Sequence, residues 1–193
     1  MDKIIKQIHE YVEKEMIKND PAHDFLHVKR VVKLAKQIAA SYSNVNLFYL
    51  EMIAYLHDMQ DDKLESNHTT ATLVSYLQSL KVEEKDIDFI IKGISCISFR
   101  KYPNANPTFP IEVQIVQDAD RIDAIGAIGV ARTFSYGGAH HTCFYGNEKS
   151  TIHHFEEKLL LLYERLNTRV AKEIAKERHD FLCAFYKQFL KEI

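Results

Sequence analysis

The sequence predicts an all-α protein, a single-domain helical bundle. Only 6 Gly and 4 Pro occur in 193 residues, and most of them lie in two stretches, 103–110 and 126–146. Elsewhere apolar residues recur at the three- and four-residue spacing of an amphipathic helix. A chain of this length fits one domain with its own hydrophobic core. We therefore expect residues 1–193 to form one domain.

Apolar spacing also places the individual helices. It predicts helices near 4–12, 28–38, 47–56, 68–80, 84–96, 111–123, 151–166 and 168–191. A helical pattern that begins near Ile111 ends at Tyr136-Gly137-Gly138. Two loops are expected, at 99–110, which holds three prolines, and at 140–147.

Composition argues against several classes of protein. There are 25 Lys and Arg against 27 Asp and Glu, so no excess of positive charge indicates a nucleic-acid partner. Cys96, Cys143 and Cys183 are odd in number, lie far apart and form no close pair, which argues against a disulfide framework and a zinc knuckle. Neither a signal core nor a membrane span of about 20 apolar residues is found. We expect a protein of the reducing cytoplasm, without membrane or nucleic-acid partners, and a homodimer is left open.

The first candidate site is the pair His57-Asp58, which follows an apolar helix. Neighbouring residues on a helix point about 100° apart, so two side chains at its last turn can reach one ion between them. The alternative is a solvated helix end.

A second polar cluster precedes this pair. His23, His27 and Arg30 follow one another at spacings of four and three residues, so they share one helical face beside Asp24. Three basic groups on one face favour a functional site over an isolated surface histidine.

The third cluster interrupts an apolar helix with three carboxylates, Asp118, Asp120 and Asp123, and with Arg121. Burial of this much charge is unfavourable unless the groups are paired or bind a metal. Asp118 cannot point in the same direction as Asp120, whereas Asp120 and Asp123 can. The segment is therefore either an ion-pair network around Arg121 or one metal ligand with supporting residues.

The three clusters together resemble the HD-domain metal-dependent phosphohydrolases. Each of the family's three motifs has a similar sequence here: His27-Val28-Lys29-Arg30-Val31, Ala54-Tyr55-Leu56-His57-Asp58 and Ala119-Asp120-Arg121-Ile122. The resemblance covers about residues 20–135, and residues 150–193 supply further C-terminal helices. The chain as a whole looks like the small stand-alone bacterial subgroup, some members of which hydrolyse nucleoside triphosphates to the monophosphate and pyrophosphate.

The resemblance implies one divalent ion bound by four residues, which are His27, His57, Asp58 and Asp120. Two imidazoles and two carboxylates suit manganese best, with nickel, cobalt, zinc, iron or magnesium as alternatives. Motif alignment selects Asp120 as the ligand of the third motif and leaves Asp118 and Asp123 in supporting roles. We expect one ion and not two, because a second ion would need further histidines on the helices that follow the doublet, where only His68 is available.

The resemblance also implies catalytic residues. Asp61 stands where HD nucleotidases carry a catalytic acidic residue, and Asp62 competes with it for the role of general base. His23 is a candidate partner of a ligand or proton donor to the leaving group. Several cations are needed to bind a di- or triphosphate, and the candidates are Arg30, Lys63, Lys101 and Arg121.

The expected function is hydrolysis of a phosphorylated small molecule, first of all a nucleoside triphosphate. One alternative is a nucleotidase or phosphodiesterase that acts on another phosphorylated metabolite. Another is a non-catalytic metal-binding sensor, which the complete ligand set disfavours.

Overall fold

The computed structural model describes residues 2–16, 24–59 and 69–193, and within these ranges the regular structure is helical. This confirms the predicted all-α fold class. The α helices are α1 (Asp2–Glu15), α2 (Phe25–Ala39), α3 (Leu47–Leu56), α4 (Thr70–Ser79), α5 (Glu84–Ser95), α6 (Ile111–Asp123), α7 (Gly126–Ala139), α8 (His153–Glu157) and α9 (Arg169–Lys191). No helix in the described ranges is long and apolar enough to cross a bilayer.

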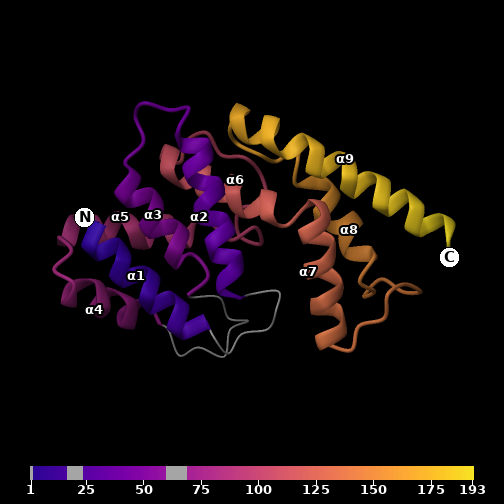
Figure 1. Ribbon diagram of the computed structural model, residues 1–193, viewed down its shortest axis with the longest axis horizontal. Helices are drawn as coiled ribbons and strands as arrows, with labels where there is room; N and C mark the ends of the chain where they lie inside the picture. The colour runs from indigo at the N-terminus through magenta and orange to yellow at the C-terminus, as the bar shows by residue number, and fades with distance from the viewer. Residues whose placement is uncertain (1, 17–23, 60–68) are drawn as a thin grey trace.

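Helix α6 lies at the centre of the molecule. Figure 1 shows α1 to α5 on one side of it and α7 to α9 on the other. Helix α2 packs on both α3 and α6, and α6 also contacts α9. Helix α3 is apolar around most of its circumference, and Leu50 to Leu56 are buried except for Glu51. The buried sides of α2, α3 and α6 thus form the core that holds the site.

The start of α2 is fixed by a local hydrogen bond. Asp24 is the N-cap residue, and its side chain accepts a hydrogen bond of 2.9 Å from the backbone N–H of His27. Aspartate at this position satisfies a helix-end donor that has no partner within the helix. The cap places His27 in the first turn of α2.

The helical pattern expected from Ile111 to Tyr136-Gly137-Gly138 is divided into α6 and α7. Gly126 has φ +76°, a left-handed conformation that residues with a side chain rarely adopt. Gly129 allows the two helices to approach, because a Cβ there would lie 2.2 Å from the carbonyl oxygen of Ala124. The break turns α7 away from the direction of α6 (Figure 1).

The single helix predicted over 151–166 is also not formed. It is replaced by α8, a 3₁₀ turn at Leu159–Leu161 and further turns. The chain leaves the helical conformation at Lys158, where φ is −135° and ψ is −62°. Phe155, Leu159, Leu162 and Leu166 are nonetheless buried. Their spacing of four, three and four residues therefore predicted correctly that these side chains are buried. It did not predict that the backbone hydrogen bonds of a continuous helix are absent.

The expected loop between α5 and α6 is non-helical, as its prolines predicted, and it is anchored at several points. The backbone N–H of Asn106 donates to Asn167 Oδ1 at 2.8 Å, and Gln114 Nε2 donates to the Phe109 carbonyl at 2.7 Å. These bonds tie the loop to α6 and to the start of α9.

Candidate metal centre

The four expected metal ligands come from helix ends. His27 lies in the first turn of α2, His57 is the C-cap residue of α3 with Asp58 directly after it, and Asp120 lies in the last turn of α6. The apolar neighbours of these residues in the same turns, Val28, Leu56 and Ile122, remain buried in the core. The fold therefore brings four polar side chains to one point without opening the apolar core.

The distances between the four side chains fit a single ion. His27 Nε2 lies 3.3 Å from Asp58 Oδ2 and 3.5 Å from Asp120 Oδ1. His57 Nε2 lies 3.3 Å from Asp58 Oδ1 and 3.9 Å from Asp120 Oδ1. Donor atoms that each lie about 2.1 Å from one cation are separated by about 3 to 3.5 Å. Of the four printed distances, three lie in or close to this range, and the fourth, between His57 and Asp120, is somewhat longer. One donor atom from each of His27, His57 and Asp58 lies within 4.8 Å of the other two, so these three residues form a group that could hold a metal ion.

The hydrogen bond of His57 fixes the tautomer that a metal requires. His57 Nδ1 lies 2.9 Å from the carbonyl oxygen of Ala54, which can only accept, so Nδ1–H is the donor. In the neutral tautomer, the Nε2 atom then carries the lone pair. It is buried and has no hydrogen-bond partner among the described residues. A buried acceptor nitrogen beside two carboxylates fits a bound cation.

His27 is held in the matching orientation by Asp123. Its Nδ1 atom lies 2.8 Å from Asp123 Oδ2, which leaves Nε2 directed at Asp58 and Asp120. Burial alone would lower the pKa of His27, but hydrogen bonds with Asp123 and Asp58 outweigh it and raise the pKa to about 9. Because a metal binds the unprotonated nitrogen, a divalent cation at Nε2 would compete with a proton for this position.

Asp123 is itself held by two arginines. It is fully buried, and it accepts hydrogen bonds from Arg30 Nε at 2.7 Å, Arg30 Nη2 at 3.0 Å and Arg132 Nη1 at 2.9 Å. Burial alone would raise the pKa of Asp123, but the bonds from His27 and Arg30 and the charge of Arg132 hold it well below its ordinary value. The carboxylate stays ionised and accepts from His27.

Sequence reasoning missed Arg132. A signal was present, because Arg132 is the one charged residue in the sequence of α7. What it contacts could not be read from that sequence, since the contact depends on the break between α6 and α7.

Asp118 points to the other side of α6. Its buried carboxylate accepts hydrogen bonds from the backbone N–H groups of Asn167 and Thr168, at 2.7 and 2.8 Å, and from both of their side chains. Thr168 is the N-cap residue of α9. Asp118 thus attaches the start of α9 to α6 and lies away from the candidate metal centre.

The expected phosphate contacts are placed differently from one another. Arg30 is half-buried against Asp123, whereas Arg121 is 2% exposed and donates to the carbonyl oxygens of Tyr102 and Arg165. No ion pair of Arg121 is found in the described ranges, so the ion-pair network considered as one alternative around it is not formed there.

Lys101 is exposed in the loop before α6, and no described contact joins it to the four candidate ligands. His23, Asp61, Asp62 and Lys63 lie outside the described residues, as does His68.

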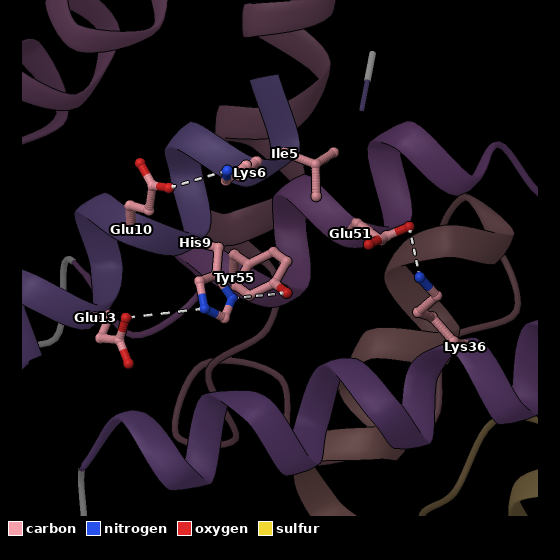
Figure 2. A pocket seen from close by; sticks show the side chains of 8 residues that line it. All are labelled: Ile5, Lys6, His9, Glu10, Glu13, Lys36, Glu51 and Tyr55. Atoms are coloured by element: carbon pink, nitrogen blue, oxygen red, sulfur yellow. Dashed lines mark hydrogen bonds and ion pairs between the residues drawn. The ribbon is translucent and has the colours of Figure 1, made fainter. Parts of the chain in front are cut away.

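An open groove is lined by residues of α1, α2 and α3, and none of the candidate ligands is among them. Its volume is about 580 Å³. Figure 2 shows charged side chains paired around it, with Lys6 3.8 Å from Glu10 and Lys36 3.0 Å from Glu51. Because these charges are already paired, we place the chemistry at the histidine and aspartate cluster and not in this groove.

A helical bundle that gathers two histidines and two aspartates around one point defines a candidate metal-dependent hydrolase. Comparison with known families gives the same class, because residues 24–125 match the model of the HD domain. The chain belongs to the HD-domain family, and its similarity to solved HD-superfamily hydrolases places it among the metal-dependent hydrolases.

Full-length relatives support this assignment. The Bacillus subtilis protein YpgQ is 38% identical over 191 residues, which is 97% of this chain and 93% of YpgQ. The crystal structure of YpgQ in complex with ADP superposes with a TM-score of 0.84 at 37% identity, over 98% of this chain and 97% of that one. An HD-superfamily hydrolase from Bacillus thuringiensis gives a TM-score of 0.78 at 35% identity, over 99% and 97% of the two chains.

Proposed function

We propose that this chain hydrolyses a nucleoside triphosphate to the monophosphate and pyrophosphate, with one divalent cation held by His27, His57, Asp58 and Asp120. The observation that carries the proposal is the cluster of four donor side chains, whose atoms are spaced for one ion. The similarity to YpgQ, whose crystal structure contains ADP, supports a nucleotide as the substrate.

We propose manganese as the cation, because two imidazoles and two carboxylates are a mixed ligand set of borderline softness. When bound, the cation polarises a phosphoryl oxygen and offsets negative charge that develops on the phosphates. The protein contributes ligands whose tautomer and ionisation are set by Ala54 and Asp123.

The reaction forms a bond between a water oxygen and the α phosphorus and breaks the bond between that phosphorus and the α–β bridging oxygen. Asp61 takes the proton of the attacking water in this proposal, with Asp62 as the alternative base and His23 as a proton donor to the leaving pyrophosphate. Lys63, Lys101 and the partly exposed Arg30 are proposed phosphate contacts. Arg121 is left out of this set because its guanidinium is buried against backbone carbonyls.

Product analysis in ¹⁸O-labelled water tests the proposal. Each reaction contains the protein, Mn²⁺ and one class of substrate. The classes are nucleoside triphosphates, diphosphates, monophosphates and phosphodiesters. We expect pyrophosphate and a nucleoside monophosphate that carries the ¹⁸O. Orthophosphate released from a monophosphate would instead favour a nucleotidase. The absence of product from every ester would indicate a metal-binding sensor.

Asp61→Asn tests the assignment of the general base. We expect turnover to fall by roughly 10²- to 10⁴-fold, which is the usual size of a general-base contribution, while Mn²⁺ and nucleotide still bind. Asp62→Asn is the matched control and should lose much less activity. If the two variants show the opposite order, Asp62 is the base.

A further inference from the structure

We infer that Asp123 and Arg132 are positioning residues of the metal centre, and that through them helix α7 contributes to metal binding without supplying a ligand. The chain of contacts runs from Arg132 to Asp123 and from Asp123 to His27. The inference rests on the proposed metal site, because its effect is on how well His27 binds the cation.

The carboxylate of Asp123 accepts hydrogen bonds on both of its oxygen atoms. Oδ1 accepts from Arg30 Nε at 2.7 Å, and Oδ2 is shared by Arg30 Nη2, Arg132 Nη1 and His27 Nδ1, at 3.0, 2.9 and 2.8 Å. Four donors around one fully buried carboxylate leave it little freedom to rotate. The His27 ring is therefore held in one orientation.

The two arginines come from different parts of the molecule. Arg30 lies three residues after His27 on α2, so its contact with Asp123 joins α2 to α6. Arg132 reaches the same carboxylate from α7, which packs on α9. Among the described contacts of the four candidate ligands and Asp123, the hydrogen bond from Arg132 to Asp123 is the one that comes from helices α7 to α9.

The physical effect is on the imidazole. A histidine that donates its second ring N–H to a carboxylate is fixed in the tautomer that binds metal, and its ligand nitrogen becomes more basic. An ionised carboxylate in the protein interior is stable only when cations or donors compensate its charge. Arg132 supplies part of this compensation, so its loss should loosen the orientation of His27 and weaken metal binding.

The test is the affinity of the full-length protein for Mn²⁺, measured by titration of the free Mn²⁺ signal in electron paramagnetic resonance. The variants are Arg132→Gln and Arg132→Lys. Loss of an outer partner of a metal ligand weakens metal binding by about 10- to 100-fold, and we expect an effect of this size for Arg132→Gln. Arg132→Lys keeps the charge, so its affinity should lie between those of Arg132→Gln and the parent protein.

Arg178→Gln is the matched control. Arg178 also donates to α6, at 3.0 Å to the carbonyl oxygen of Ile122, but it has no described contact with His27 or Asp123. Glutamine keeps the Cβ and Cγ that pack on Gly126. We expect normal Mn²⁺ affinity in this variant even if its unfolding temperature falls, which separates positioning from general stability.

A spectroscopic readout adds a measurement that a merely structural role would not change. In protein loaded with diamagnetic Zn²⁺, the Nδ1–H proton of His27 should give a slowly exchanging resonance because Asp123 shields it. We expect this resonance to shift and broaden in Arg132→Gln and to stay unchanged in Arg178→Gln.

The outcomes are distinct. Unchanged Mn²⁺ affinity in Arg132→Gln overturns the inference, even if activity is lost. If Arg132→Gln does not fold, unchanged affinity in Arg132→Lys overturns it. If the parent protein binds no Mn²⁺, the proposed metal site itself fails and the inference fails with it.

Discussion

Three aspartates within one short segment have three different partners. Asp118 attaches α9, Asp120 faces the two candidate histidine ligands, and Asp123 holds His27 from behind. The division follows from helical geometry, since residues two apart on a helix point in nearly opposite directions while residues three apart share a face. A carboxylate moved by one position would therefore serve a different partner.

This division predicts opposite phenotypes for two conservative substitutions. Asp120→Asn should weaken Mn²⁺ binding by more than the roughly 10- to 100-fold typical of an outer partner, with little change in stability. Asp118→Asn should leave Mn²⁺ affinity nearly normal but lower the free energy of unfolding by about 1 to 3 kcal/mol, because the donors at the start of α9 lose a charged acceptor. Urea unfolding and Mn²⁺ titration of both variants test this, and loss of metal in Asp118→Asn alone would reverse the assignment.

The histidine and aspartate at the end of α3 should be needed for metal but not for folding. His57→Ala and Asp58→Ala are expected to lose both Mn²⁺ and hydrolysis while the helical circular dichroism signal is kept, because the apolar residues of α3 still pack. His153→Ala is a surface control, since His153 pairs with Glu157 away from the centre. Retained hydrolysis in either of the first two variants would contradict the mechanism.

At the scale of elements, the junction between α6 and α7 decides where Arg132 lies. The left-handed Gly126 turns the chain, and Gly129 lets α7 approach the carbonyl group of Ala124. Arg132 follows three residues after Gly129, on the same side of α7, and from there reaches Asp123. The junction therefore links the packing of α7 to the support of His27.

Gly129→Ala should disturb both stability and metal binding. Its Cβ would lie 2.2 Å from a backbone oxygen, so the junction must open. Overpacking of this kind costs about 1 to 3 kcal/mol, and the shift of α7 should also weaken Mn²⁺ binding. Thermal unfolding and Mn²⁺ titration measure the two effects.

Gly138→Ala on the same helix is the control for this substitution. No atom outside the local helix backbone lies within 4 Å of its added Cβ, and alanine should stabilise the helix by up to about 0.5 to 1 kcal/mol. Equal effects of the two substitutions would argue against a special role of the junction.

At the scale of the whole molecule, the proposed cation joins three helices that are distant in sequence, α2, α3 and α6. A ligand that binds only the folded state stabilises it, by about 2.7 kcal/mol when its concentration is a hundred times the dissociation constant. We therefore expect Mn²⁺ to raise the unfolding temperature and a chelator to reverse the increase. In His57→Ala the unfolding temperature should not respond to Mn²⁺, and a full response there would place the ion elsewhere.

Much of this organisation could be predicted from the sequence, because its signals are local. Helical spacing of apolar residues predicted the all-α class, and the order of His27, His57-Asp58 and Asp120 indicated the HD-domain family, as the comparison with known families confirms. Spacing on one helix also predicted that Asp118 points away from Asp120. The fold class and the direction of Asp118 need only the geometry of one helix at a time, whereas the family was indicated by the resemblance of three motifs.

The tertiary structure decided what lies beyond one helix. Helical spacing reports which residues are buried but not where backbone torsions break a helix. The end of α6 was predicted at its observed place, but α7 was not predicted as a separate helix, and the break at Lys158 was missed. Helical spacing also does not reveal which hydrogen-bond acceptor the guanidinium group of a buried arginine contacts. Arg121 donates hydrogen bonds to backbone carbonyl groups, whereas Arg132 donates to the carboxylate of Asp123. Each choice depends on how separate helices pack, because a buried charge takes the partner that the neighbouring element brings within hydrogen-bond distance.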